Sequence, residues 1–430
     1  MTTFEELPPG GSGLLSARPG PDLVARGYAE REYVARGTAV SYAGHDPAAF
    51  ATRVAVRRPV APGSFSGTVV VEWLNVSSGS DAAPDWTYLA EEIVRRGHAW
   101  VGVSAQHAGV EGGDAAVGVT GVAPTGIKGR QRYAGLHHPG DAYCWSIYAS
   151  VAAGLDEGPL ADLVVDARLA VGESQSAYAL TTFANVVHPR LPVFAGFLVH
   201  SRGGAAMPLG EPGAGVEPRL FRGTEPVPIR EDLDVPVVMV QTETDLVGLL
   251  DYLPARQPDS ELVRLWEVAG TAHADRFQIG EHEALLGCPR PVNRGQQAYV
   301  LRAALRWLDG WARGGDPAPS ADRLEVVGRS FVLDAAGNAR GGVRTPVVDA
   351  PVELLRGDTE PGASYLCQLF GSTLPMAPEA LRERYEDRAA YLAAYARATD
   401  AALAAGFVLP EDRAEVLAEA RPELVDAAYA

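Results

Sequence analysis

The sequence has few cysteines, fewer basic than acidic residues, and no long apolar run. Its 430 residues contain only Cys144, Cys288 and Cys367, without a C-x-x-C pair, so neither a disulfide framework nor a zinc knuckle is indicated. With 37 basic against 54 acidic residues, the formal charge is −17, and no basic surface is offered to nucleic acid or anionic lipid. No apolar run approaches the roughly 20 residues that span a bilayer. We therefore expect no nucleic-acid partner and no membrane partner.

The N-terminal segment MTTFEELPPGGSG also lacks the basic and apolar regions of a secretion signal. Together with the low cysteine content, which fits a reducing compartment, this favours a cytoplasmic location. The oligomeric state is left open, and a homo-oligomer is compatible with these residues.

The chain has enough apolar residues for one large core or two ordinary ones, because 47% of its residues are hydrophobic and 21% are charged. Short β-rich runs alternate with longer helical runs, a pattern typical of a mostly parallel central sheet with helices on both faces. We expect strands at 51–58, 66–74, 99–105, 167–172, 194–200, 235–241 and 262–269, and helices at 84–96, 140–154, 175–187 and 293–313.

The alternation predicts a core over residues 1–320 and a different organisation beyond it. Gly-rich and Gly/Pro-rich insertions at about 107–139 and 202–233 interrupt the core, and long irregular segments of this kind usually form lids or binding loops. Residues 321–430 change to short strands and then to Ala/Glu/Arg-rich helix. We expect this segment to be an appendage packed on the core, because no flexible linker precedes it.

The stretch RLAVGESQSAYAL, residues 168–180, places Ser174 on a corner between an expected strand and an expected helix. A nucleophilic serine on such a corner needs small residues two positions before and after it, because strand and helix approach closely there. Gly172 meets the first requirement, and Ser176 replaces the usual second glycine. The N–H of Gln175, at a helix N-terminus, would form half of an oxyanion hole. The alternative is an ordinary turn in which the serine caps the helix.

An acid and a histidine follow at the ends of later strands, in the order that this kind of site requires. After the strand at 235–241 come Glu243 and Asp245, and we favour Asp245 as the acid, with Glu243 as the alternative. One strand later, His273 follows Gly270 in a turn. The carboxylate would fix the tautomer of the imidazole, which would accept the serine proton. Separately, Asp245 could be a helix cap and His273 a surface histidine, and His200 is a rival because it also ends a strand.

Further residues are expected around this edge of the sheet. The second oxyanion donor is expected in the loop after the strand at 66–74, as the N–H of Asn75 or Val76. Aromatic and histidine side chains on neighbouring segments suggest a pocket for an apolar substrate, although they could equally belong to the core. These pocket candidates are Trp73, Trp86, Tyr133, His137 and His200. Glu281, His282 and Glu283 lack the spacing of a zinc site, so we expect no metal.

Several short motifs together resemble a family of bacterial α/β-hydrolase domain proteins. They are EWLNVSSG (72–79), PDW (84–86), GVSAQ (102–106), RYAGLHHPGD (132–141), GESQS (172–176), QTETD (241–245), GTAHA (270–274) and GGVRTPVVD (341–349). The resemblance spans nearly the whole chain and implies an α/β-hydrolase fold with serine ester hydrolysis. It also implies that a serine at position 176 is normal within the group.

The combined expectation is a serine carboxylic-ester hydrolase that forms an acyl-enzyme on Ser174, with His273 and Asp245, and needs no cofactor. The substrate would be a small to medium, apolar ester or lactone. Acyl transfer to an alcohol, thioester hydrolysis and amide hydrolysis use the same three residues and stay as alternatives. A member of this fold that binds a ligand without chemistry is the alternative of a different class.

Overall fold

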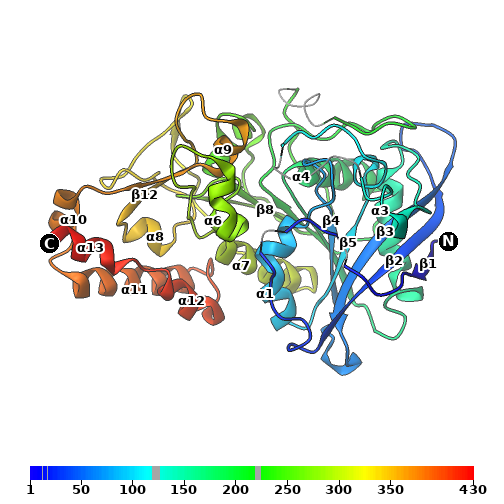
Figure 1. Ribbon diagram of the computed structural model, residues 1–430, viewed down its shortest axis with the longest axis horizontal. Helices are drawn as coiled ribbons and strands as arrows, with labels where there is room; N and C mark the ends of the chain where they lie inside the picture. The colour runs from blue at the N-terminus through cyan, green and yellow to red at the C-terminus, as the bar shows by residue number, and fades with distance from the viewer. Residues whose placement is uncertain (12, 17, 119–125, 218–223) are drawn as a thin grey trace.

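The computed structural model describes residues 1–11, 13–16, 18–118, 126–217 and 224–430. Figure 1 shows the large sheet with its covering helices in one part of the molecule and the C-terminal segments, from α8 to α13, beside it at the other end. Part of each expected insertion, residues 119–125 and 218–223, lies outside the described residues.

The described residues form a nine-stranded sheet in the order β1-β2-β3-β5-β4-β6-β7-β8-β9. Strands β1 to β3 and β5 pair antiparallel, and the run from β5 through β4 to β9 is parallel. The strands are β1 (Thr3–Glu6), β2 (Tyr28–Ala39), β3 (Ala48–Pro59), β4 (Thr68–Trp73), β5 (Ala99–Val103), β6 (Ala167–Glu173), β7 (Gly196–His200), β8 (Val237–Thr242) and β9 (Val263–Val268). The carboxyl ends of the parallel strands therefore meet at one edge, where a site can form.

Helices cover both faces of the sheet, because its central strands are apolar at successive positions. On β6, Leu169 and Val171 face a cluster shared with helices α1 (Pro84–Arg95) and α7 (Gln297–Ala312). The intervening Ala170 faces the cluster shared with α3 (Cys144–Gly154) and α4 (Gln175–Thr182). This confirms the predicted fold class, a mostly parallel sheet between two helical layers.

All seven predicted strands occur, with bounds shifted by a few residues, and so do the four predicted helices. The helix predicted at 175–187 continues from α4 into one π-helical turn at Phe183–Val187. Strands β1 and β2 were not predicted. β2 carries Glu30, Glu32 and Arg36, and charges at this density are typical of a loop. In the structure, Glu30 instead forms an ion pair at 2.7 Å with Arg57 of the neighbouring strand.

The insertions and the C-terminal quarter are built from short elements. The first insertion contains α2 (His107–Glu111) and a 3-10 turn at Gln131–Tyr133, and the described part of the second is irregular. The C-terminal quarter contains two small antiparallel sheets, β10 (Val326–Val327) with β11 (Ser330–Phe331) and β12 (Glu353–Arg356) with β13 (Ser372–Pro375). Its helices are α8 (Pro346–Asp349), α9 (Tyr365–Phe370), α10 (Pro378–Arg384), α11 (Arg388–Ala404), α12 (Arg413–Ala418) and α13 (Pro422–Tyr429).

The cysteines differ from the sequence expectation, because Cys288 and Cys367 form a disulfide with their Cα atoms 5.5 Å apart. They are 79 residues apart in the chain, Cys288 in a loop and Cys367 in α9, so no spacing motif predicts the pair. Cys144 is a buried free thiol. The sequence pattern indicates no disulfide framework, and this single bond is a feature that it does not predict. Disulfides are rare in reducing compartments, so low cysteine content alone is a weak basis for a compartment.

Candidate active site

Ser174 lies on a strained turn at the edge of the sheet. β6 ends at Glu173, α4 begins at Gln175, and Ser174 between them has φ 59° and ψ −119°. A positive φ on a residue with a side chain costs on the order of 1–3 kcal/mol and persists only where the surroundings impose it. Here the N–H of Ser174 donates to the His200 carbonyl oxygen at 2.9 Å, which fixes the turn against β7.

The close approach of strand and helix explains the residues on either side of the serine. A Cβ placed on Gly172 would lie 3.0 Å from both the Ser176 Cβ and the Leu180 Cδ1, so a larger residue there would require these neighbours to shift by a few tenths of an ångström. Ser176 is fully buried and its side chain is accommodated in this contact. The contact is therefore tight at position 172, while position 176 carries a hydroxymethyl group.

Ser174, His273 and Asp245 form a chain of hydrogen bonds. The His273 Nε2 lies 2.8 Å from the Ser174 Oγ, and the His273 Nδ1 lies 2.7 Å from the Asp245 Oδ1. An ionised carboxylate only accepts hydrogen bonds, so Nδ1 carries the proton and Nε2 is free to accept the serine proton. Asp245 and His273 are buried, whereas Ser174 is partly exposed. The arrangement can generate a serine nucleophile.

Asp245 is held by the loop that precedes it. Thr242 and Asp245 form a capping box at the start of α5 (Glu243–Leu246). The Asp245 Oδ2 accepts hydrogen bonds from the Thr242 N–H at 2.7 Å and the Thr242 hydroxyl at 2.8 Å. Its other oxygen lies 2.7 Å from the His273 Nδ1, so one side chain both caps the helix and contacts the histidine.

Glu243 joins the acid loop to two other loops through its carboxylate oxygens. Its Oε1 accepts from the Gly270 N–H at 2.7 Å, and its Oε2 accepts from the Gly357 N–H at 3.0 Å. Burial raises the pKa of Glu243 to about 7, although the two N–H groups oppose this rise. Glu243 therefore fastens the histidine loop and the C-terminal quarter to the acid loop.

Glu173 places a second carboxyl group beside the histidine, which the sequence reasoning missed. Its Oε1 lies 3.4 Å from the His273 Nε2, and its Oε2 accepts from the Asn75 Nδ2 at 3.3 Å. Burial, followed by the carboxylates of Asp85, Asp245 and Glu72, raises the pKa of Glu173 well above its ordinary value. A neutral Glu173 leaves the imidazole free to act as a base. The only available signal was its position directly before Ser174.

The structure separates the oxyanion candidates. Gln175 is the first residue of α4, and N–H groups of a first helical turn have no acceptor within the helix. The Asn75 N–H donates to the Ala82 carbonyl oxygen at 2.9 Å, so this backbone donor is already committed, which differs from the expectation. The Val76 N–H makes a long contact of 3.5 Å to the Gln175 Oε1. Gln175 and Val76 remain as the pair of candidate donors.

Ser174, Glu173 and His273 line a cavity of about 450 Å³. The remaining lining comes from residues 15–16, from 75–87, from Val117, from 274–286 and from 365–370. Most of these side chains are apolar. The wall includes α6 (Arg276–Ile279), the 3-10 helix η7 (Gly280–Leu286) and α9 of the C-terminal quarter. The first expected insertion contributes only Val117 among the described residues, and the described part of the second contributes none.

The aromatic pocket candidates belong to the core. Trp73 is buried against Trp145, with ring centroids 5.4 Å apart, and Trp86 is buried against Trp100 at 5.1 Å. Tyr133 is buried and donates its hydroxyl to Glu32 at 2.9 Å. None of the three lines the cavity in the described part of the chain. The expectation fails because adjacency to the strand ends also fits side chains that point between sheet and helices.

The histidine candidates lie elsewhere too. The His137 side chain is 61% exposed and its Nδ1 is 3.5 Å from Glu111. His200 is fully buried beneath the site, with its Nδ1 3.0 Å from Asp85 and its Nε2 3.5 Å from Gln297. Neither lines the cavity within the residues described. His200 contributes its backbone carbonyl to the serine turn instead.

The sheet order, the covering helices and a serine on the turn after a central parallel strand define an α/β hydrolase. The chain belongs to the alpha/beta hydrolase domain family, whose model matches residues 5–418. Among curated proteins, no relative matches the chain. Across the described residues, no helix is both long and apolar enough to cross a bilayer.

Three solved structures are similar to the chain at low identity. An α/β serine hydrolase without a lid from Xanthomonas campestris is 15% identical, with a TM-score of 0.34 over 64% of this chain and 95% of that chain. A cold-adapted esterase from an Arctic intertidal metagenomic library is 13% identical, with a TM-score of 0.33 over 56% and 84%. A glucuronoyl esterase from Solibacter usitatus is 11% identical, with a TM-score of 0.31 over 62% and 81%.

Proposed function

We propose that the protein is a serine carboxylic-ester hydrolase that acts on esters with an apolar portion. The observation that carries the proposal is the hydrogen-bonded chain from the Ser174 Oγ through His273 to Asp245, with distances of 2.8 and 2.7 Å, at the wall of a cavity. Cavities of this size and apolar character are typical of small-molecule sites. The family to which the chain belongs supports a hydrolase.

In the proposed reaction, the Ser174 Oγ attacks the ester carbonyl carbon while the His273 Nε2 accepts the serine proton. The N–H groups of Gln175 and Val76 stabilise the oxyanion of the tetrahedral intermediate. His273 returns the proton to the departing alcohol, leaving an acyl group on Ser174. Water, deprotonated by His273, attacks that acyl group in the second half, so the carboxylic acid leaves and the serine is regenerated. Asp245 stabilises the imidazolium that forms in both halves.

The first test is covalent labelling by a fluorophosphonate, read as the intact mass of the wild type and of Ser174→Ala. We expect the wild type to gain one phosphonyl group and the variant to gain none. An unlabelled wild type that still binds apolar esters would overturn the proposal in favour of a binding protein.

The second test measures the products from p-nitrophenyl esters in water and with added short alcohols. A hydrolase releases free carboxylic acid as the main product at low alcohol concentration. Predominant formation of the new ester would instead make the protein an acyltransferase. Thioester and anilide analogues of one acyl group, compared by kcat/KM, distinguish an esterase from a thioesterase or an amidase.

A further inference from the structure

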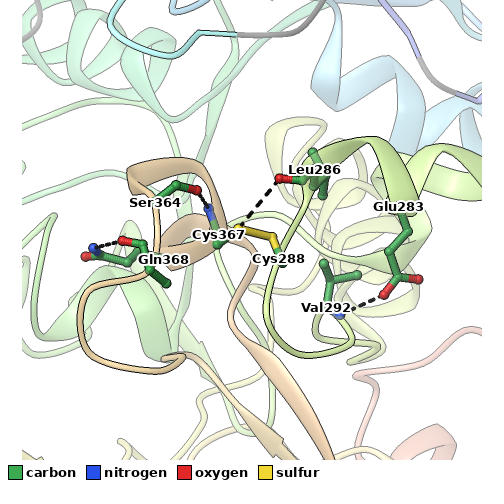
Figure 2. The surroundings of a disulfide bond; sticks show 8 residues. Glu283, Leu286, Cys288, Val292, Ser364, Cys367 and Gln368 are labelled. Carbon is green, nitrogen blue, oxygen red and sulfur yellow. Dashed lines mark hydrogen bonds between the residues drawn. A yellow bond between two sulfur atoms is a disulfide. The ribbon is translucent and has the colours of Figure 1, made fainter.

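The disulfide joins two segments that form the apolar wall of the candidate active site. Cys288 follows η7, which contributes Leu285 and Leu286 to the cavity wall, and Cys367 lies within α9, which contributes Leu366 and Phe370. Figure 2 shows the bond between the loop that carries Leu286 and Cys288 and the segment that carries Ser364 and Cys367. The bond and the wall therefore belong to one local structure.

Backbone hydrogen bonds hold the two ends of the wall segment, and the disulfide is a further link between η7 and its second end. At one end, the Ala274 N–H donates to the Leu369 carbonyl oxygen at 3.0 Å. At the other end, the Asn293 N–H donates to the Phe370 carbonyl oxygen at 2.9 Å. Between them runs an arc of short helices and turns, residues 275–292, and the disulfide joins this arc to α9.

Both ends of the arc have further contacts, because Phe277 stacks on Tyr88 and the Thr373 N–H donates to the Pro291 carbonyl oxygen at 2.9 Å. The part around η7 has fewer. The longest helix of the arc, η7, is of the 3-10 type, whose hydrogen-bond geometry is poorer than that of an α-helix. Leu285, which lines the cavity, is 68% exposed, so this part of the wall is not anchored by burial. The Val292 N–H donates to the Glu283 Oε1 at 2.9 Å within the arc itself. Around η7, the disulfide therefore adds to the apolar packing of Ile279 and Leu286 with Phe370.

We propose that the Cys288–Cys367 disulfide is a redox-sensitive clamp that holds the wall in position around the apolar chain of the ester. This inference rests on the proposed function. With the bond formed, η7 and α9 face each other and the chain of the substrate lies between them. With the bond cleaved, the middle of the arc moves away from α9, while Ala274 and the adjoining His273 stay anchored. Reduction therefore weakens binding of long chains and leaves the hydrolytic step intact.

Cleavage requires a thiol reductant, and the proposal names a dithiol. Two thiolate attacks in succession transfer two electrons to the protein disulfide. Cys288 and Cys367 each gain a proton and become thiols, and the reagent becomes a cyclic disulfide. The reductant attacks the sulfur of Cys288, which is partly exposed, whereas Cys367 is 1% exposed and leaves as the thiolate. Cys144 is a buried free thiol outside the bond.

The experiment compares p-nitrophenyl acetate, butanoate, hexanoate and octanoate for the oxidised and the dithiothreitol-reduced enzyme. A matched series of alkyl acetates of increasing alcohol length tells whether the wall receives the acyl or the alcohol chain. We expect kcat/KM of the oxidised enzyme to rise about fourfold per methylene group in one of the two series, equivalent to about 0.8 kcal/mol for each. After reduction the rise falls to about twofold, mainly through KM, while acetate turnover changes by less than about twofold.

The double variant Cys288→Ala/Cys367→Ala is the matched control. It should show the chain-length profile of the reduced wild type and no response to dithiothreitol. A chain-length profile equal to that of the oxidised wild type in both series would overturn the clamp. Alkylation of the native, reductant-treated wild type should add two groups. A disulfide that stays intact under these conditions would overturn the redox-sensitive part.

Hydrogen exchange gives a readout that needs no turnover. Reduction should speed exchange of amides in 275–292 and leave the 241–246 loop unchanged. If no ester is hydrolysed, the proposed function fails, while faster exchange confined to 275–292 still supports the clamp. If esters are hydrolysed and the exchange of the arc does not change, the clamp fails alone.

Discussion

Replacing Asp245 by asparagine should abolish most of the turnover by trapping the wrong histidine tautomer. The Thr242 N–H and hydroxyl both approach the Asp245 Oδ2, at 2.7 and 2.8 Å. An asparagine must place its oxygen there, because its amino group would meet a fixed N–H donor. The amino group then faces the His273 Nδ1 and donates to it. The imidazole consequently carries its proton on Nε2 and cannot accept the proton of Ser174.

The expected loss is large because the geometry persists while the base is removed. Wrong tautomers of this kind lower kcat about 10,000-fold in serine hydrolases with the same three residues. That factor corresponds to about 5.5 kcal/mol of transition-state stabilisation. The assay is kcat for p-nitrophenyl acetate, together with the rate of fluorophosphonate labelling, which reports the nucleophile without turnover. Circular dichroism and the melting temperature establish that the variant is folded.

Glu243→Gln is the matched control, because it makes the same change from carboxyl to amide at a neighbouring side chain that binds Gly270 and Gly357 instead of His273. Its oxygens accept from Gly270 and Gly357, and burial raises the pKa of Glu243 to about 7, so an amide replaces a group that is partly protonated at neutral pH. We expect a stability loss of about 1–3 kcal/mol, from one buried N–H that loses its acceptor, with kcat within about threefold of wild type. Equal losses of kcat in the two variants at equal folded fraction, or retention of a tenth of kcat by Asp245→Asn, would refute this assignment of the acid.

Two further predictions concern the residues around Ser174. Glu173→Gln should have the wild-type kcat near neutral pH. At alkaline pH the wild type should lose kcat, because ionised Glu173 would accept a hydrogen bond from a proton on the His273 Nε2, whereas the variant should retain kcat. The pH-rate profiles of both proteins check this. Because burial raises the folded-state pKa of Glu173, its contribution to stability is complete at acidic pH and is lost as pH rises toward that pKa. Between acidic and alkaline buffer, the melting temperature of Glu173→Gln should therefore fall less than that of the wild type. Equal falls in the two proteins would contradict the burial argument. Gly172→Ala should lose about 1–3 kcal/mol of stability and most of the activity, since its Cβ would lie 3.0 Å from Ser176 and Leu180. Ser176→Gly should cost about 0.5 kcal/mol of stability and keep its activity. Urea unfolding and kcat/KM distinguish the two variants.

The sequence predicts that Ser174, Asp245 and His273 meet at one edge of the sheet, because that arrangement follows from local rules. Apolar runs mark the parallel strands, and the carboxyl ends of parallel strands meet at one edge. Ser174, Asp245 and His273 each lie within a few residues of such an end, so their order along the chain is enough to predict that they lie close together. The choice between Asp245 and Glu243 was different. It depends on which carboxylate Thr242 caps, and both residues follow the same strand.

The cavity wall could not be predicted, because it is assembled from segments that are remote in sequence. Leu15, residues 274–286 and residues 365–370 meet only in the folded chain. Aromatic side chains near the strand ends were the available signal, but Trp73 and Trp86 fill the space between sheet and helices. The disulfide is of the same kind, since its two cysteines are 79 residues apart and only the packing of α9 on the arc brings them together.

This difference has a consequence for proteins with the same motifs. The proposed catalytic residues are positioned by the strand ends and by the close contact at Gly172, where an added Cβ would lie 3.0 Å from Ser176 and Leu180. The wall can change without disturbing them, because Glu243 and the backbone bonds of Ala274 anchor the catalytic loops independently of the arc 275–292. Relatives that keep the GESQS, QTETD and GTAHA segments can therefore share one reaction and differ in substrate. Exchange of residues 275–292 and 362–371 between two such relatives should transfer chain-length preference, read as the ratio of kcat/KM for octanoate and acetate, and leave kcat for acetate unchanged. A ratio that stays with the catalytic core instead would place the specificity elsewhere.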